Sequence, residues 1–341
     1  MHTQHAHAQT IDNDTLAHHD GRLPDNQRRS PDMVGRLRRR IFGISVESAT
    51  FARRGFYVGD PVVRDHLEQI GRTFLYGYHL ALEQTAPVAL SNGLGHVPLE
   101  ERGFAYEGAA MALALLDIVA PWSGRRFERF LAGPAEAHTY MVHVGAGWAL
   151  ARLRAPLEAA VRRLDPLLGW LVIDGYGFHE GYFAWPRYLA AQAPVRPLRG
   201  LASHVFDQGF GRSLWFVQGA DAARIANTIQ SLAPDRHSDL WSGVGLACAY
   251  AGGVNEATLV TLRKVAGEFL PDVAQGAAFA AGVRERASNP AIHTDLACRM
   301  FMGISAVEAA ALTQSTLFNL PDGQPGIAYA TWRSRIRAQL K

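Results

Sequence analysis

The stretch "DQGFGRSLWFVQGAD", residues 207–221, places two glycines inside a run that otherwise has the composition of a helix. A glycine in a helix interior costs about 1 kcal/mol relative to alanine, so its use there needs a reason. The stretch "SGVGLACAYAGGVNEA", residues 242–257, has the same form. Repetition of this kind predicts an array of similar helical units in which the glycines are contact points between helices.

Glycine followed by small and apolar residues recurs along the chain. The pattern occurs at Gly77, Gly108, Gly145, Gly181, Gly209, Gly243 and Gly276. The five intervals from Gly108 to Gly276 cover 168 residues, with a mean of 33.6. That length suits a hairpin of two helices, and the alternation typical of strands is scarce. The sequence therefore predicts an all-α protein.

The second half of several units carries signals for the start of another helix. Asp221 and Asn255 are predicted N-caps, because each precedes apolar residues at helical spacing. Ser305 and Glu308 have the spacing of a capping box, in which each side chain binds the backbone N–H of the other residue. These signals favour paired helices within each unit.

A finer spacing narrows the fold class. Alanine follows glycine after twelve residues in the pairs Gly147 and Ala159, Gly211 and Ala223, and Gly245 and Ala257. This spacing resembles the tetratricopeptide repeat, which has a glycine in its first helix and an alanine in its second. The resemblance implies a superhelix of tandem αα-hairpins, in which small residues let the two helices of one hairpin approach closely. An αα-toroid is the alternative architecture.

Composition and charge exclude several classes of protein. The net charge is only +3. The arginine-rich segment 35–42 is short, and we interpret it as a solvated helix edge. We therefore expect no nucleic-acid binding. Cys248 and Cys298 stand alone in apolar segments, which indicates buried thiols rather than a disulfide framework or a zinc site. The chain shows no signal peptide and no apolar run long enough for a transmembrane segment, so we expect a cytoplasmic protein.

The composition changes twice along the chain. Residues 1–32 are polar and contain five histidines, and we expect them to form a disordered leader. Residues 33–320 are predicted to form a single helical-repeat domain, and residues 321–341 a C-terminal tail that is partly helical.

Polar residues near the repeat glycines are candidate functional groups, because the first helix of each unit lines the concave face of a tetratricopeptide-like array. The candidate catalytic residues are Glu107, His143, His179, Glu180 and Asp207. Two interpretations stay open: these side chains cap helices, or several converge in a groove as acid–base groups or metal ligands. No zincin, P-loop or nucleophile-elbow motif is present, and the metal and cofactor stay unassigned.

A second set of residues is a candidate for substrate binding. Its members are aromatic or polar side chains near the repeat glycines: Tyr176, Phe178, Tyr182, Trp185, Gln208, Arg212, Trp241 and Gln275. The segment 175–188 holds more aromatic residues than one buried stripe needs, which suits the binding of a long unsaturated hydrocarbon. Arg212 is a candidate for an anionic partner, although an ion pair with Asp207 or Asp221 is the commoner outcome.

Several long blocks resemble a bacterial family whose members accompany enediyne polyketide synthases in actinobacterial gene clusters. The blocks are "FARRGF", "RGFAYEGAAMALALLD", "YMVHVGAGWALARL", "DGYGFHEGYF", "FDQGFGRSLWFVQGAD" and "DLWSGVGLACAYAGGV". The resemblance extends from about Arg40 to about residue 320. It implies an accessory protein of enediyne antibiotic biosynthesis, with the polyketide synthase and other accessory proteins as partners and a polyene intermediate as ligand. It assigns no catalytic residue.

Three functions are compatible with these features, and the sequence leaves open whether the protein is an enzyme. The first is an enzyme, or a subunit of one, that helps convert the linear polyene into the enediyne core. The second is a non-catalytic helical-repeat scaffold that holds the synthase or a partner enzyme. The third is a carrier that shields a reactive hydrocarbon. The polar residues near the glycines favour the first.

Overall fold

Helices and short 3-10 turns make up the regular structure of the chain. The computed structural model describes residues 33–191 and 198–339, and no strand is found in these ranges. The all-α prediction is therefore confirmed. The predicted leader at 1–32 lies outside the described residues.

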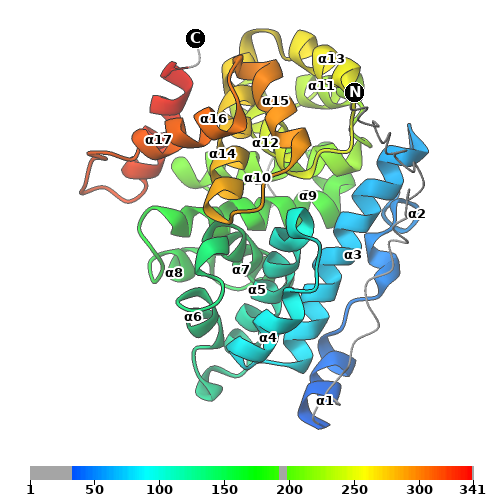
Figure 1. The fold of residues 1–341 in the computed structure, drawn as a ribbon, viewed down its shortest axis with the longest axis vertical. Helices are drawn as coiled ribbons and strands as arrows, with labels where there is room; N and C mark the ends of the chain where they lie inside the picture. The colour runs from blue at the N-terminus through cyan, green and yellow to red at the C-terminus, as the bar shows by residue number, and fades with distance from the viewer. Residues whose placement is uncertain (1–32, 192–197, 340–341) are drawn as a thin grey trace, which may run out of the picture.

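Seven helices pack against one another in chain order and are called the inner helices (Figure 1). They are α3 (Pro61–Glu83), α5 (Arg102–Val119), α7 (Thr139–Leu153), α9 (Leu171–Ala191), α10 (Leu201–Val217), α12 (His237–Ala251) and α14 (Leu270–Arg286). Most of their residues are buried on every side, as in the run from Gly103 to Leu116 of α5. A helix that is apolar all round belongs in the interior of a protein, and these helices form the core.

Shorter helices cover the inner ones. They are α4 (Pro87–Leu94), α6 (Arg126–Leu131), α8 (Leu157–Val161), α11 (Ala222–Gln230), α13 (Glu256–Ala266) and α15 (Ile292–Met302). The chain begins with α1 (Met33–Phe42) and α2 (Phe51–Arg54) and ends with α16 (Ala306–Ser315) and α17 (Ile327–Gln339). The predicted caps are confirmed, because Asp221 and Asn255 cap α11 and α13, and Ser305 and Glu308 form a complete capping box on α16.

Glycine pairs explain how the inner helices pack so closely. A Cβ atom at Gly145 would overlap the carbonyl oxygen of Glu107 on the preceding inner helix, and one at Gly147 would overlap that of Val172 on the following one. Residues i and i+2 of an α-helix lie about 200° apart around the axis, so the two glycines face opposite neighbours. The same arrangement occurs at Gly175 and Gly177, Gly209 and Gly211, and Gly243 and Gly245.

The contact partners correct one prediction. Each glycine of these pairs touches an adjacent inner helix, whereas the sequence predicted contact with the second helix of its own hairpin. Two of the three alanines expected to complete that contact, Ala223 and Ala257, are exposed on the outer helices α11 and α13, and the side chain of Ala159 lies outside the described part of the structure. The glycines are thus helix contacts, as predicted, but they join successive units along the array.

The array also coils back on itself. The imidazole of His66 on α3 lies 2.7 Å from the carbonyl oxygen of Ala251 on α12, and Arg284 of α14 donates a hydrogen bond of 3.1 Å to the carbonyl of Glu100, just before α5. The first inner helices therefore meet the sixth and seventh. The concave side of the array is a closed interior instead of the open groove expected for a tetratricopeptide-like superhelix.

Two further predictions concern burial and membranes. Cys248 and Cys298 are free and buried, as predicted. Within the described ranges, no individual helix has both the length and the apolar composition to cross a bilayer, although the sharply bent pair of α15 and α16 meets these two criteria together.

Candidate functional site

A narrow cavity lies where the inner helices α3, α5, α7, α9, α10 and α12 surround a common axis. Its volume is small, about 50 Å³. Aromatic rings supply much of the wall: Phe74, Phe104, Trp148, Phe178, Tyr182, Phe183, Phe216 and Tyr250. This space is called the central cavity below.

Glu107 of α5 is the carboxyl group in the wall of the central cavity. Its side chain is buried, and its Oε1 atom has no hydrogen-bond partner. The pKa of Glu107 is raised to about 7, chiefly by burial and to a smaller extent by nearby Asp174, while Arg212 and the indole of Trp148 oppose the shift. Both protonation states are therefore available near neutral pH, which is the property required of a general acid or base.

Arg212 of α10 supplies the positive charge in the same wall. It forms a buried ion pair with Asp174 of α9, and its guanidinium lies 4.9 Å from the centre of the Phe178 ring. Burial disfavours the charge, but Asp174 and Glu107 raise the pKa of Arg212 overall. The sequence predicted Asp207 or Asp221 as its partner, and this prediction is wrong, because the partner lies on the adjacent inner helix.

Further polar groups in the cavity wall are buried without well-formed hydrogen bonds. The Nε atom of Arg212 has no partner. The indole of Trp148 faces Glu107 and the hydroxyl of Tyr250 faces Asn289, but neither contact has the geometry of a full hydrogen bond. Leaving a buried polar group unpaired costs about 1–3 kcal/mol, so native proteins keep few of them. Unpaired buried atoms also occur elsewhere in the described part of the chain, for example on Gln275 and Arg333, so those of the cavity make it a candidate ligand site only together with its aromatic lining.

A second narrow cavity adjoins the first. Its wall shares Arg212, Leu246 and Tyr250 with the central cavity and extends to Trp332 of α17. The two spaces therefore lie on either side of the Arg212 and Tyr250 side chains. Asp174 belongs to the second wall, so the ion pair between Asp174 and Arg212 separates the two spaces.

The other candidate catalytic residues do not line the central cavity. His143 is buried on α7, where its Nδ1 atom lies 2.7 Å from the carbonyl oxygen of Thr139, and burial lowers its pKa. Its Nε2 atom has no partner. His143 thus lies outside the wall of the central cavity.

His179 and Glu180 form a local group on α9. The Nδ1 atom of His179 lies 3.3 Å from Glu180, and the hydroxyl of Tyr188 donates a hydrogen bond of 2.5 Å to the same carboxylate. Burial lowers the pKa of His179. Burial also acts to raise the pKa of Glu180, but the hydrogen bonds from His179 and Tyr188 outweigh it and lower that pKa overall. The ring of His179 packs edge-on against Trp148 at 5.6 Å, so this group lies behind the cavity wall.

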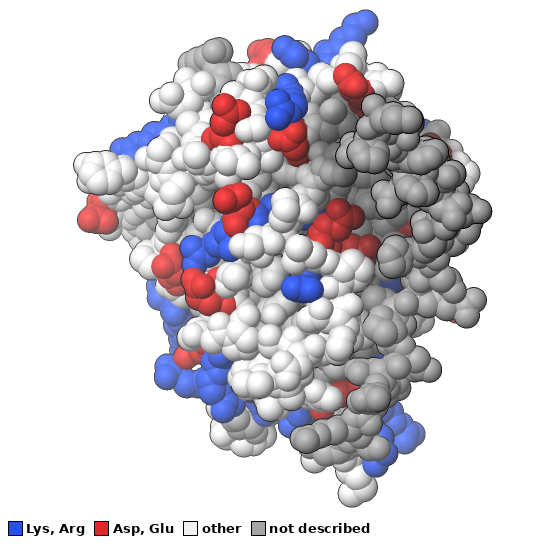
Figure 2. Space-filling view, viewed as in Figure 1, with Lys and Arg blue, Asp and Glu red and all other residues white. Residues whose placement is uncertain are grey.

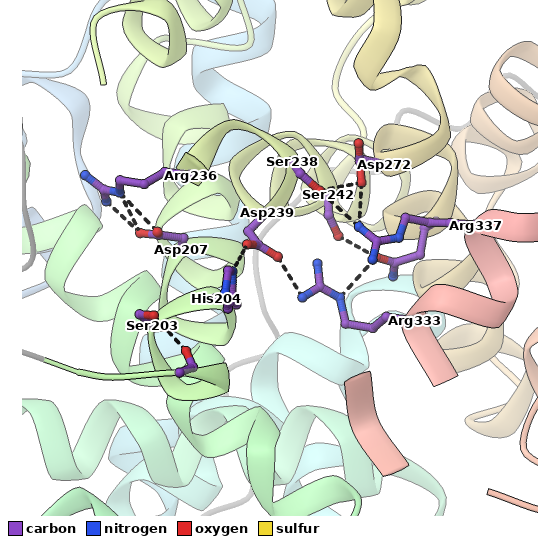
Figure 3. Close-up of polar contacts among 12 residues, drawn as sticks. Ser203, His204, Asp207, Arg236, Ser238, Asp239, Ser242, Asp272, Arg333 and Arg337 are labelled. Carbon is purple, nitrogen blue, oxygen red and sulfur yellow. Dashed lines mark hydrogen bonds and ion pairs between the residues drawn. The ribbon is translucent and has the colours of Figure 1, made fainter. Parts of the chain in front are cut away.

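Asp207 belongs to a different region, shown in Figure 3. It accepts hydrogen bonds of 2.6–3.1 Å from Arg236. Asp239, on α12, pairs with His204 and Arg333. Asp272, on α14, pairs with Ser238 and Arg337. This set is called the arginine–aspartate network, and it connects α10, α12, α14 and α17. Its carboxylates are all paired, which is typical of a structural role.

Only some of the predicted substrate-binding residues line the central cavity. Phe178, Tyr182 and Arg212 line the central cavity. Gln208 donates a hydrogen bond of 2.9 Å to Asp174, and Gln275 accepts one of 2.8 Å from Ser242. The remaining three lie outside the wall of the central cavity: Tyr176, Trp185 and Trp241.

Asp174 is the functional candidate that the sequence analysis missed. The repeat was placed at Gly181, but the glycine pair of α9 is Gly175 and Gly177, and Gly181 instead contacts Ser213. When the repeat is aligned on Gly175 instead of Gly181, Asp174 directly precedes the repeat glycine, as Glu107 directly precedes Gly108. The signal was present, since "DGYGF" at 174–178 has the same two-glycine form as "QGFGR" at 208–212.

The described residues contain no group of three or more His, Cys, Asp or Glu side chains placed to hold a metal ion. The residues that could contact a bound organic group are those of the central cavity, through Glu107, Arg212 and Tyr250. Their chemistry is proton transfer and hydrogen bonding in apolar surroundings.

Residues 33–340 match the model of a family described as a protein of unknown function, DUF1702. The chain belongs to this family. A search of curated proteins and a search of solved structures found no match. The family match covers all of the inner helices and both cavities.

Proposed function

We propose that this chain is an accessory protein of enediyne antibiotic biosynthesis that binds a linear polyene in the central cavity and acts on it as an enzyme or enzyme subunit. The resemblance of its sequence blocks to proteins that accompany enediyne polyketide synthases supports the pathway. The observation that carries the site is Glu107, a buried carboxyl with an unpaired oxygen inside an aromatic wall.

The shape of the cavity suits such a ligand. Its free space is narrow, and its wall is mostly aromatic and apolar, with a few polar groups. Flat rings pack well against an extended conjugated chain, whereas a bulky or strongly hydrated ligand would leave charges unsolvated. A thin unsaturated hydrocarbon with one polar end matches these properties.

Glu107 can move a proton on such a chain. For a polyene that ends in a carbonyl group, the Glu107 carboxylate removes a proton from one carbon and returns it to another. The double bonds then move along the chain, and no atom is gained or lost. The unpaired Nε donor of Arg212 can hold the carbonyl oxygen while negative charge develops on it.

Complementation of a deletion strain tests the role of Glu107. Glu107→Gln keeps the size of the side chain and removes its proton-transfer chemistry, so we expect loss of the enediyne core and accumulation of an earlier polyene. Glu101→Gln is the matched control, because Glu101 accepts a hydrogen bond from Thr73 away from the cavity and should support production.

Binding is tested separately with parinaric acid, a linear conjugated fatty acid whose fluorescence rises in apolar surroundings. Ala247→Leu fills part of the cavity and should weaken binding at least tenfold, while Ala257→Leu on the exposed side of α13 should not. Stearic acid, its saturated counterpart, should compete less well.

The two assays also separate the alternatives. A carrier would lose production with Ala247→Leu and keep it with Glu107→Gln, because shielding needs the cavity but no proton transfer. A scaffold for the synthase or a partner enzyme would keep production with both. The enclosed aromatic wall favours the carrier over the scaffold as the second candidate.

A further inference from the structure

Helix α1 presents an apolar face to solvent. Met33, Val34, Leu37 and Ile41 are 79%, 51%, 56% and 59% exposed, and no other part of the described chain covers them. Single exposed apolar residues are common, but four on one helix face form a stripe. Such a stripe usually faces the core of a protein, and here it faces outward.

The opposite face of α1 attaches the helix to the protein. Gly35 is buried, Arg39 forms an ion pair of 2.6 Å with Glu83 of α3, and Tyr78 donates a hydrogen bond of 2.8 Å to the carbonyl of Phe42. At about 100° per residue, the four apolar side chains span an arc of about 100° on the other side of the axis. Because these contacts hold the opposite face of α1 against the protein, the apolar stripe must point outward.

Arginines flank the apolar arc on both sides. Arg38 follows one edge, Arg36 and Arg40 follow the other, and α1 contains no acidic residue. Figure 2 shows basic side chains at the lower end of the molecule, where Figure 1 places α1. An amphipathic helix with basic residues beside its apolar face is typical of binding to anionic lipid surfaces.

We propose that α1 binds the surface of an anionic membrane, with Met33, Val34, Leu37 and Ile41 among the lipid chains and the arginines at the phosphates. The stripe lies on a projecting helix at one end of the long axis, which suits a broad flat surface better than a groove (Figure 1).

The position of α1 also matters for the central cavity. Ile44, two residues after the end of α1, belongs to the cavity wall, as do Ser48 and Ala49. The membrane proposal itself does not depend on the identity of the ligand, because it concerns only the surface of α1.

Vesicle flotation of the full chain tests the proposal. We expect binding to phosphatidylcholine vesicles that contain phosphatidylglycerol, weaker binding to pure phosphatidylcholine, and a decrease in added salt. Ile41→Glu should lower partitioning about tenfold or more, since it places a charge in the apolar face. Each of Arg36→Gln and Arg40→Gln should lower it about fivefold.

Ile292→Glu is the matched control, because Ile292 is 88% exposed on α15 and lies outside α1. It should bind vesicles as the unmodified chain does, and thermal unfolding should show that both variants fold. Absence of vesicle binding by the full chain would overturn the proposal, as would equal losses for the two glutamate variants. Self-association that Ile41→Glu abolishes, without vesicle binding, would instead assign the stripe to a second copy of the chain.

Discussion

The central cavity and the arginine–aspartate network are both buried and polar, yet their polar groups are satisfied differently. In the network, Asp207, Asp239 and Asp272 each pair with an arginine. In the cavity, Glu107 keeps an oxygen without a hydrogen bond. Burial alone therefore does not identify a functional group. A buried carboxylate that is fully paired is typical of a structural role, whereas a buried carboxyl with an unpaired oxygen is a candidate for ligand binding.

The two regions share one helix. Asp207 and Arg212 are both on α10, and Gly209 between them lies against the carbonyl oxygen of Asp174 on α9. The distance between α9 and α10 therefore affects the cavity and the network together. Three substitutions distinguish these contributions, beginning with the one that disturbs both regions.

Gly209→Ala should have the largest effect, a loss of more than about 4 kcal/mol in the free energy of unfolding or failure to fold. The new Cβ atom would overlap backbone, which cannot move as a side chain can. Urea denaturation followed by circular dichroism measures the loss. Gly95→Ala is the control, because Gly95 has an ordinary helical φ of −61° and meets only its own preceding turn. Equal stability of the two variants would contradict the packing role of Gly209.

Arg236→Ala should lower the free energy of unfolding by about 3–5 kcal/mol, because it leaves the Asp207 carboxylate buried without its cation. The double variant Arg236→Ala with Asp207→Ala should lose less than the single one in the same denaturation experiment. A single variant within about 1 kcal/mol of the unmodified protein would show that this pair is not structural. Polyene binding should be retained in whichever variant remains folded.

Glu107→Gln should have the smallest effect on stability, and the effect should depend on pH. The pKa of Glu107 is about 7 in the folded protein, above its ordinary value of 4.5, so the folded state holds the proton more tightly than the unfolded chain. The carboxyl therefore contributes stability that is complete below pH 4.5 and is lost as the pH rises through about 7. The full contribution is at most about 3 kcal/mol.

The measurement is the difference in unfolding free energy between the unmodified protein and Glu107→Gln across this range. Buried His79, His138 and His293, whose pKa values burial lowers to about 4, titrate in both proteins and cancel in the difference. The difference should fall as the pH rises. A flat difference would mean that Glu107 is ionised throughout and is paired like the carboxylates of the network.

Local signals predicted much of the fold. The caps at Asp221 and Asn255 and the capping box at Ser305 involve residues within one turn of each other, so the sequence contains the whole interaction. The repeated glycines likewise predicted an all-α array. The partner of each glycine was not predictable in the same way, because it lies on a helix about thirty residues away and sequence spacing does not show which helix that is.

The amino-acid sequence by itself determined which segments are helices, where they begin, and that glycine marks the helix contacts, since these properties depend on neighbouring residues. Only the tertiary structure decided that the array closes around a cavity, that Arg212 pairs with Asp174, and that one oxygen of Glu107 lacks a hydrogen bond while Asp207 is paired with Arg236. Those outcomes depend on how successive helices are stacked and coiled. A carboxyl group in a helix has the same sequence signal whether a guanidinium or an empty aromatic wall faces it.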